Sequence, residues 1–247
     1  MPSEPEARLV AVLSDVHGNA VALQAVLAEL EVAAPDLVVF GGDLTWGPLP
    51  ERTLELVHEL SVPTRFVAGN AERVLLEPSE EPTPRETWMR AKHPCEALDF
   101  LAGFERTVSI DIEGLGSTFF CHGSPRSDEE LVAPRTPEKR MRALAEGLRE
   151  RVLVSAHTHV QFDRRTAGLR SVNAGSVGMP YEARPGAYWA LLGPDVELRR
   201  TEYALDAAAA AYRATDDPLA EEMVEVLETP PDRDEAIERA EALEFSG

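Results

Sequence analysis

Residues 8–32, RLVAVLSDVHGNAVALQAVLAELEV, decide the fold. The apolar run predicts a buried strand over residues 8–13 that ends at Ser14 and Asp15. Apolar side chains then recur at helical spacing over residues 20–32, and Asn19 stands at the N-cap position of that helix. The stretch therefore predicts a strand, a polar turn and a helix that packs back on the strand.

The same rhythm repeats twice more along the chain. A second strand is predicted over residues 36–40 and a helix over residues 51–60. A third strand over residues 62–67 is followed by Gly69 and Asn70. Since each crossover between parallel strands needs a long connection, usually a helix, this β-α-β-α-β order predicts a parallel sheet.

The rest of the chain predicts a second group of strands and added helices. Residues 77–104 form a Pro- and Glu-rich loop and a helical insertion, interrupted near Pro94. Hairpins are expected at residues 106–121, 162–172 and 188–200, with a helix at 137–149 and a strand at 152–155 between them. We expect one main domain, residues 1–204, and a C-terminal extension of two or three helices, residues 205–247, packed on it.

Composition argues against several classes of function. The 247 residues carry a formal net charge of −20, which opposes binding to nucleic acid or to an anionic membrane. No apolar run approaches the ~18 residues of a transmembrane helix, and the acidic N-terminus is unlike a secretory signal. Cys95 and Cys121 form no CxxC pair, so we expect reduced thiols in a cytoplasmic protein.

Polar side chains that can bind metals follow most of the predicted strands. Strand ends at one edge of an α/β sheet converge, and ligands bind there. Each residue alone has a plainer explanation: His122 in a turn, Asp43 as a cap, and His157 with His159 as hydrogen-bonded core histidines. Their joint occurrence favours a site. The candidates are Asp15, His17, Asp43, Asn70, His122, His157 and His159.

The residue types indicate the chemistry of that site. Imidazole and carboxylate suit Mn, Fe, Zn, Co and Ni, and Asn70 adds an oxygen ligand without charge. Two such metals ~3.5–4 Å apart can share a hydroxide and stabilise the attacking and leaving oxygens of an in-line displacement. We therefore predict two divalent metal ions, with Mn as the first expectation.

The motifs resemble the five blocks of the calcineurin-like metallophosphoesterases, in the same order from about residue 9 to residue 178. The blocks are SDVHGN at 14–19, Gly42-Asp43, Gly69-Asn70, His122-Gly123 and AHTH at 156–159. The start, together with NAGS at 173–176, is similar to the compact bacterial and archaeal phosphodiesterase branch.

This resemblance implies a four-layer α/β/β/α sandwich of two mixed sheets flanked by helices. It implies one metal held by Asp15, His17, Asp43 and His159, and a second held by Asp43, Asn70, His122 and His157. It places Asp43, His122 and Asn19 in catalysis. Asn19 and Arg126 are expected to bind the substrate phosphate, although Asn19 can equally serve only as a helix cap and Arg126 only in a surface ion pair.

The chain departs from the family pattern at one position. Many members have histidine after the Gly-Asn pair, where this chain has Ala71, so a general acid is missing and substrates with good leaving groups are expected. His93 is a possible substitute, although a surface position is the plainer expectation. The absence of Asp-Arg-Gly after Asp43 disfavours protein phosphatase activity.

These inferences favour metal-dependent hydrolysis of a small, possibly nucleotide, phosphate ester by a phosphodiesterase or phosphatase. Two alternatives stay open: a non-catalytic scaffold, as in a retromer subunit of this fold, and a nuclease, which the net charge disfavours. The physiological substrate and the oligomeric state do not follow from the sequence.

Overall fold

Neighbouring residues of the first strand, β1 (Val10–Leu13), face opposite sides of a sheet, and both sides are buried. Ala11 and Leu13 belong to a core beneath the first helices, whereas Val10 and Val12 belong to a core between two sheets. The structure, a computed structural model, describes residues 6–243. Strands that read as continuous apolar runs are therefore central strands buried on both faces.

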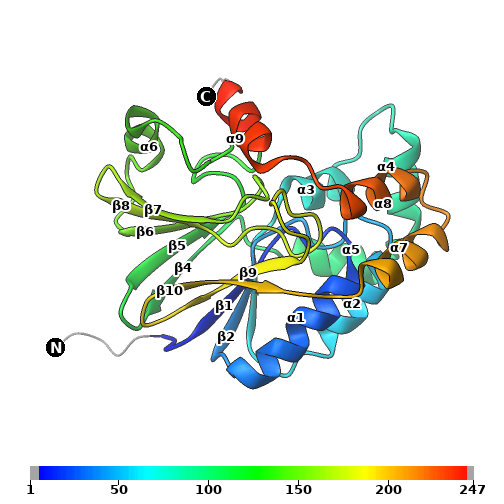
Figure 1. Ribbon diagram of the computed structural model, residues 1–247, viewed down its shortest axis with the longest axis horizontal. Coiled ribbons are helices and arrows are strands. Elements are labelled where there is room, and N and C mark those ends of the chain that lie inside the picture. Colours follow the sequence, from blue (N-terminus) through cyan, green and yellow to red (C-terminus); the bar gives the residue numbers. More distant parts are fainter. Residues whose placement is uncertain (1–5, 244–247) are drawn as a thin grey trace.

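The first sheet has the order β10-β9-β1-β2-β3. Parallel to β1 run β2 (Leu37–Phe40) and, beyond it, β3 (Thr64–Phe66), as the crossover argument predicts. On the other side of β1, β9 (Ala187–Leu192) pairs antiparallel with β1, and β10 (Val196–Thr201) pairs antiparallel with β9. Helices α1 (Ala20–Ala33) and α2 (Pro50–His58) cover the outer face (Figure 1).

The second sheet has the order β4-β5-β6-β8-β7. Its five strands are β4 (Thr107–Ile112), β5 (Gly116–Cys121), β6 (Val152–Ser155), β7 (Phe162–Thr166) and β8 (Leu169–Asn173). Strands β5, β6 and β8 are parallel, and β4 and β7 are antiparallel partners at the two edges. Helix α6 (Glu138–Leu144) packs Met141 and Leu144 on the outer face. The predicted four-layer sandwich is confirmed.

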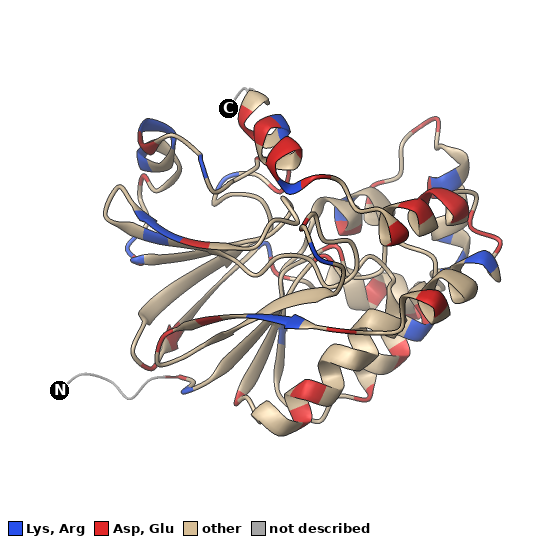
Figure 2. Ribbon diagram, in the orientation of Figure 1, with Lys and Arg blue, Asp and Glu red and all other residues tan. Residues whose placement is uncertain are grey.

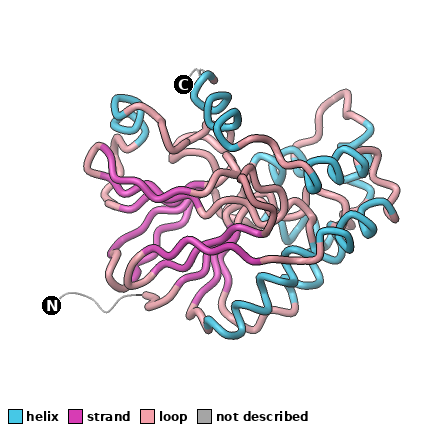
Figure 3. The backbone as a smooth tube through the Cα atoms, in the orientation of Figure 1, coloured by secondary structure: helices cyan, strands magenta, loops and turns pink. Residues whose placement is uncertain are grey.

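The remaining helices gather at one end of the sandwich, beyond the strands of the first sheet (Figures 1 and 3). They are α3 (Asn70–Leu76), α4 (Pro84–Ala91), α5 (Cys95–Ala102), α7 (Leu205–Arg213) and α8 (Ala220–Glu228), with α9 (Arg233–Ala242) above the second sheet. Acidic side chains are dense on α8 and α9 (Figure 2). Within residues 6–243, no helix has the length and apolarity to cross a membrane.

Two local expectations were wrong. The helix expected over residues 137–149 is shorter and ends at Leu144, because the turn that follows contains Gly147 at φ +86°, a conformation that a helix cannot continue through. His93 is buried rather than on the surface: its Nδ1 donates to the Met89 carbonyl and its Nε2 lies 2.9 Å from Thr45 Oγ1. The helical insertion is interrupted near Pro94 as expected.

Candidate active site

The polar residues that follow the strands meet at one edge of the two sheets. β1 leads into Asp15 and His17, β2 into Asp43, and β3 into the first residue of α3, Asn70. From the second sheet, β5 leads into His122, and β6 leads into the pair His157 and His159. The structure brings all seven residues together, in two adjoining clusters.

Asp15, His17 and His159 form the first cluster, with one ligand atom from each within 4.8 Å of the others. His159 Nε2 lies 3.2 Å from Asp15 Oδ1 and 3.1 Å from His17 Nε2. All three side chains are buried.

Asp43, His122 and His157 form the second cluster, again within 4.8 Å. His122 Nε2 lies 3.2 Å from His157 Nδ1 and 3.0 Å from Asn70 Oδ1. The two oxygens of Asp43 face different clusters: Oδ1 lies 3.5 Å from His122 Nε2, and Oδ2 lies 3.7 Å from His17 Nε2. Asp43 thus joins the two clusters as a bridging carboxylate would.

Backbone carbonyls fix three of the histidine rings. Nδ1 of His17 donates to the Trp46 carbonyl at 3.1 Å, and Nδ1 of His159 donates to the Met179 carbonyl at 2.7 Å. His122 donates in the same way to the Gly41 carbonyl at 2.8 Å. In the neutral ring this leaves Nε2 as a lone pair turned into the cluster, which is the usual arrangement of a metal-binding histidine.

In the first cluster, hydrogen-bond acceptors consequently face one another. The Nε2 lone pairs of His17 and His159 face each other, and Asp15 Oδ1 is buried beside them without a hydrogen bond of good geometry. Acceptors at such distances repel one another unless a cation lies between them. The donor set of imidazole, carboxylate and amide oxygen therefore fits two divalent metal ions better than it fits a self-contained hydrogen-bond network.

The backbone is unusual at the same residues. In residues 6–243, five of the seven non-glycine residues with positive φ belong to these clusters. They are Asp15, His17, Asp43, His157 and His159, with φ between 47° and 65°. Left-handed conformations are costly for such side chains and collect at functional sites. The short loops after the strands therefore hold the side chains in place at the expense of local strain.

The pKa values reflect burial among opposite charges. Burial alone would raise the pKa of Asp15, but neighbouring His159 outweighs it and lowers that pKa well below its usual range. Burial, together with the neighbouring His122, lowers the pKa of His157 to about 4. For His122, burial is outweighed by Asp43, which raises its pKa. Asp15 is thus held as an anion and His157 as a neutral base, the forms that bind metals.

Glu72 supports the site in a way that the sequence did not reveal. It is fully buried, and its carboxylate accepts hydrogen bonds from the backbone N–H groups of Asp43, Leu44 and Gly69 at 2.7–2.9 Å. Burial, followed by the charge of Asp43, raises the pKa of Glu72 to about 7. Glu72 thereby ties the loop after β2 to the start of α3.

A cavity of about 400 Å³ opens over the two clusters. Five of the seven candidate ligands line it, and Asp15 and His122 do not. Its wall also includes residues that the sequence did not single out for the site, and they come from five separate segments. They are Trp46, Val74, Arg85, Met179, Tyr181 and Met223. The Tyr181 ring lies 4.7 Å from that of His159. No local motif marks these residues, because only the tertiary fold brings them together.

Asn19, Arg126 and His93, which the sequence also suggested for the site, lie outside the wall of this cavity as well. Asn19 is fully buried: its Oδ1 caps α1 through the Ala22 N–H, and its Nδ2 donates to the Gly178 carbonyl and to Tyr203. Arg126 forms a two-pronged ion pair with Glu130. His93 is buried against Thr45. In this structure Asn19 acts as the cap and Arg126 as an ion-pair partner.

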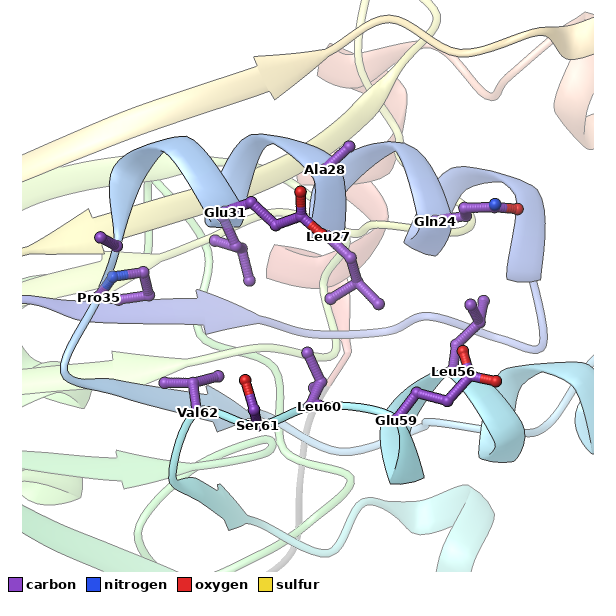
Figure 4. A pocket seen from close by; sticks show the side chains of 12 residues that line it. Gln24, Leu27, Ala28, Glu31, Pro35, Leu56, Glu59, Leu60, Ser61 and Val62 are labelled. Carbon is purple, nitrogen blue, oxygen red and sulfur yellow. The ribbon is translucent and has the colours of Figure 1, made fainter.

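A larger cavity, about 540 Å³, lies away from the site, between α1 and the end of α2 (Figure 4). Leu27, Leu56, Leu60 and Val62 form its apolar wall, and Glu31 and Glu59 stand at its rim. It contains no histidine and no basic side chain, so it lacks the groups that metal or phosphate binding requires.

Comparison with known proteins agrees with the geometry. A family model described as "Calcineurin-like phosphoesterase superfamily domain" matches residues 9–193. No curated protein matches the chain.

Solved structures share the fold over most of the chain. A metallophosphoesterase from Sphaerobacter thermophilus has a TM-score of 0.75 at 25% identity, covering 91% of this chain and 100% of that one. A hypothetical protein from Pyrococcus horikoshii OT3 has a TM-score of 0.80 at 19% identity, covering 91% and 99%. The E. coli phosphoesterase Yfce has a TM-score of 0.50 at 21% identity, covering 74% and 87%. The likeness to the latter two speaks for the fold alone.

Proposed function

The chain belongs to the calcineurin-like phosphoesterase superfamily, and on this premise we propose that it hydrolyses a small phosphate ester with the help of two divalent cations. We expect Mn²⁺ first, with Fe, Zn, Co and Ni as the other metals that these ligands suit. The observation that carries the proposal is Asp43, whose two oxygens face two separate clusters of histidine and carboxylate.

Each cluster would hold one ion, and Asp43 would bridge them. Asp15, His17 and His159 complete the first set, and Asn70, His122 and His157 complete the second. When bound, the cations would supply Lewis acidity and lower the pKa of a water molecule, so that hydroxide is available at neutral pH. The protein would contribute fixed ligand positions, through the carbonyl partners of the histidine rings and through Glu72.

The position after Asn70 bears on the choice of substrate. Ala71 lines the cavity with a methyl group, so no side chain there can give a proton to a departing alkoxide. We therefore expect faster turnover of esters with good leaving groups, such as aryl phosphates and diesters, than of simple alkyl phosphates.

A substrate panel tests the proposal. Monoesters, diesters including bis(p-nitrophenyl) phosphate, and nucleotides would be incubated with the protein reconstituted with Mn²⁺, Zn²⁺, Co²⁺ or Ni²⁺. We expect hydrolysis that needs the metal and is abolished by Asp43→Ala, with the exposed Asp99→Ala as the matched control. Absence of turnover with every metal and ester would overturn the proposal and favour the scaffold alternative.

A further inference from the structure

Arg85 is the only lysine or arginine in the wall of the metal-site cavity, among residues 6–243. It stands in the first turn of α4, in the insertion that follows the site loops, and it shares the wall with Ala71 and with Met223 of α8. A cavity that has the Asp43 carboxylate in its wall and, among the described residues, no lysine or arginine besides Arg85, is a poor site for an anion. Arg85 is the one side chain there that can attract a phosphate directly.

The Arg85 side chain is only 8% exposed, and its ion-pair partner Asp217 is fully buried. Nη2 lies 3.0 Å from Asp217 Oδ2, but the angles do not suit a hydrogen bond, and Nε, Nη2 and Oδ2 are all buried without one. Burial lowers the pKa of Arg85, against which Asp217 and Glu222 act. A guanidinium nevertheless stays charged in proteins.

Such a half-partnered guanidinium is costly unless something else binds it. A guanidinium has five N–H donors in a planar fork, and a phosphate offers oxygens that match this fork. Asp217 faces only one end of Arg85, and its other oxygen accepts from the Leu219 N–H at 2.9 Å, which fixes it at the start of α8. Donor capacity therefore remains beside the cavity.

We propose that Arg85 is a substrate-recognition residue that binds non-bridging phosphate oxygens of the ester in the cavity. The inference deepens the proposed function and rests on it for the identity of the ester. It assigns the insertion a direct role in substrate binding. It also makes the C-terminal segment part of the site, because Asp217 supplies the counter-charge and Met223 part of the wall.

Calorimetric binding of inorganic phosphate and of pyrophosphate to the Mn²⁺-reconstituted protein tests this role, with the metal content measured in every sample. Arg85→Gln should weaken binding by roughly 10- to 100-fold, the usual loss when a charge-assisted hydrogen bond is removed. Arg85→Lys keeps the charge but loses the fork, so it should fall between wild type and Arg85→Gln. Arg90→Gln is the matched control, since Arg90 lies on the same helix and donates to the Leu75 carbonyl. It should bind as wild type does.

The two anions locate the contact. An equal loss for phosphate and pyrophosphate would place Arg85 on the phosphate at the metals. A loss for pyrophosphate alone would place it on a second phosphate further along the substrate. Unchanged binding of both anions to a folded Arg85→Gln protein would overturn the proposal, as would failure of the wild-type protein to bind either anion.

A double variant is needed because Arg85→Gln alone leaves the buried Asp217 carboxylate without its ion-pair partner, which can unfold the protein. Arg85→Gln with Asp217→Asn removes both charges, and we expect the same loss of phosphate binding. If the ion pair is only structural, the double variant will bind like wild type, and the proposal is wrong. Arg85-dependent phosphate binding without turnover of any ester would instead refute the proposed hydrolysis and leave the anion site standing.

Discussion

Glu72 makes the sharpest stability prediction, because a single buried carboxylate satisfies three backbone donors. Oε2 accepts from the N–H groups of Asp43 and Gly69, and Oε1 accepts from that of Leu44. These donors belong to the loop after β2 and to the N-terminal end of α3. Within residues 6–243, none of the three N–H groups has another acceptor. Both segments carry candidate ligands.

Replacement by alanine leaves these three donors buried and unpaired. Each unpaired buried N–H costs about 1–3 kcal/mol, so Glu72→Ala should lower the free energy of unfolding by roughly 3–9 kcal/mol. That is a large part of the ~5–15 kcal/mol of a typical domain. Glu72→Gln keeps one oxygen in place of two and strands at least one donor, so about 1–3 kcal/mol is expected.

Urea unfolding of the metal-free proteins at pH 8, followed by circular dichroism, measures both losses. Glu55→Ala is the control, since Glu55 is exposed and pairs only with Arg52 on the surface. It should change the free energy of unfolding by less than about 1 kcal/mol. A Glu72→Ala protein no less stable than this control would refute the view that the carboxylate holds the two loops together.

Three further predictions concern substitutions of single residues. His122→Ala should retain one metal instead of two in elemental analysis and lose at least about 100-fold in turnover, with the circular dichroism of the sheets unchanged; full activity would contradict the two-metal assignment. Gly42→Ala should lower the free energy of unfolding by about 1–3 kcal/mol or more in urea, because φ is +98° and a Cβ would stand 2.5 Å from His122 Nδ1; unaltered stability would contradict the strain argument. Burial lowers the pKa of His93, so its unfolded form binds a proton at a higher pH than its folded form, and stability is lost as pH falls below its ordinary value of 6.5. In paired urea titrations at pH 7.5 and 5.5, His93→Gln should therefore lose less stability on acidification than wild type, and an equal loss would count against the sign of this shift.

The parallel strands of the first sheet and the grouping of the candidate ligands could be predicted because both depend on short-range patterns, whereas the four layers were expected only from the resemblance to the family. Short apolar runs mark the buried strands, helical spacing marks the helices, and the carboxyl ends of parallel strands lie at one edge of the sheet. Asp15 and His122 are far apart in the chain, yet each directly follows a strand, so their meeting follows from topology. Such placement needs no knowledge of side-chain packing.

What could not be predicted depends on contacts between distant segments. Arg85 and Asp217 are a pair only because α4 and the start of α8 pack together at the end of the sandwich. A buried His93 could not be foreseen, since Thr45 becomes its partner only through the folding of the insertion over the loop after β2. The spacing of single residues carries no information on such pairs.

The site is assembled by the fold before any ligand arrives. Three histidine rings are oriented by carbonyls, Glu72 joins two of the loops that carry candidate ligands, and five candidate ligand residues are held at positive φ. Strained residues persist only where the surroundings over-determine them. Binding of the proposed metal ions would therefore have little loop ordering to drive, and its free energy would go into relieving the repulsion among acceptors that already face one another. A net charge of −20 is compatible with the proposed anionic substrate, because the positive charge that the substrate meets would be confined to the two proposed ion sites and to Arg85 in the wall of one cavity.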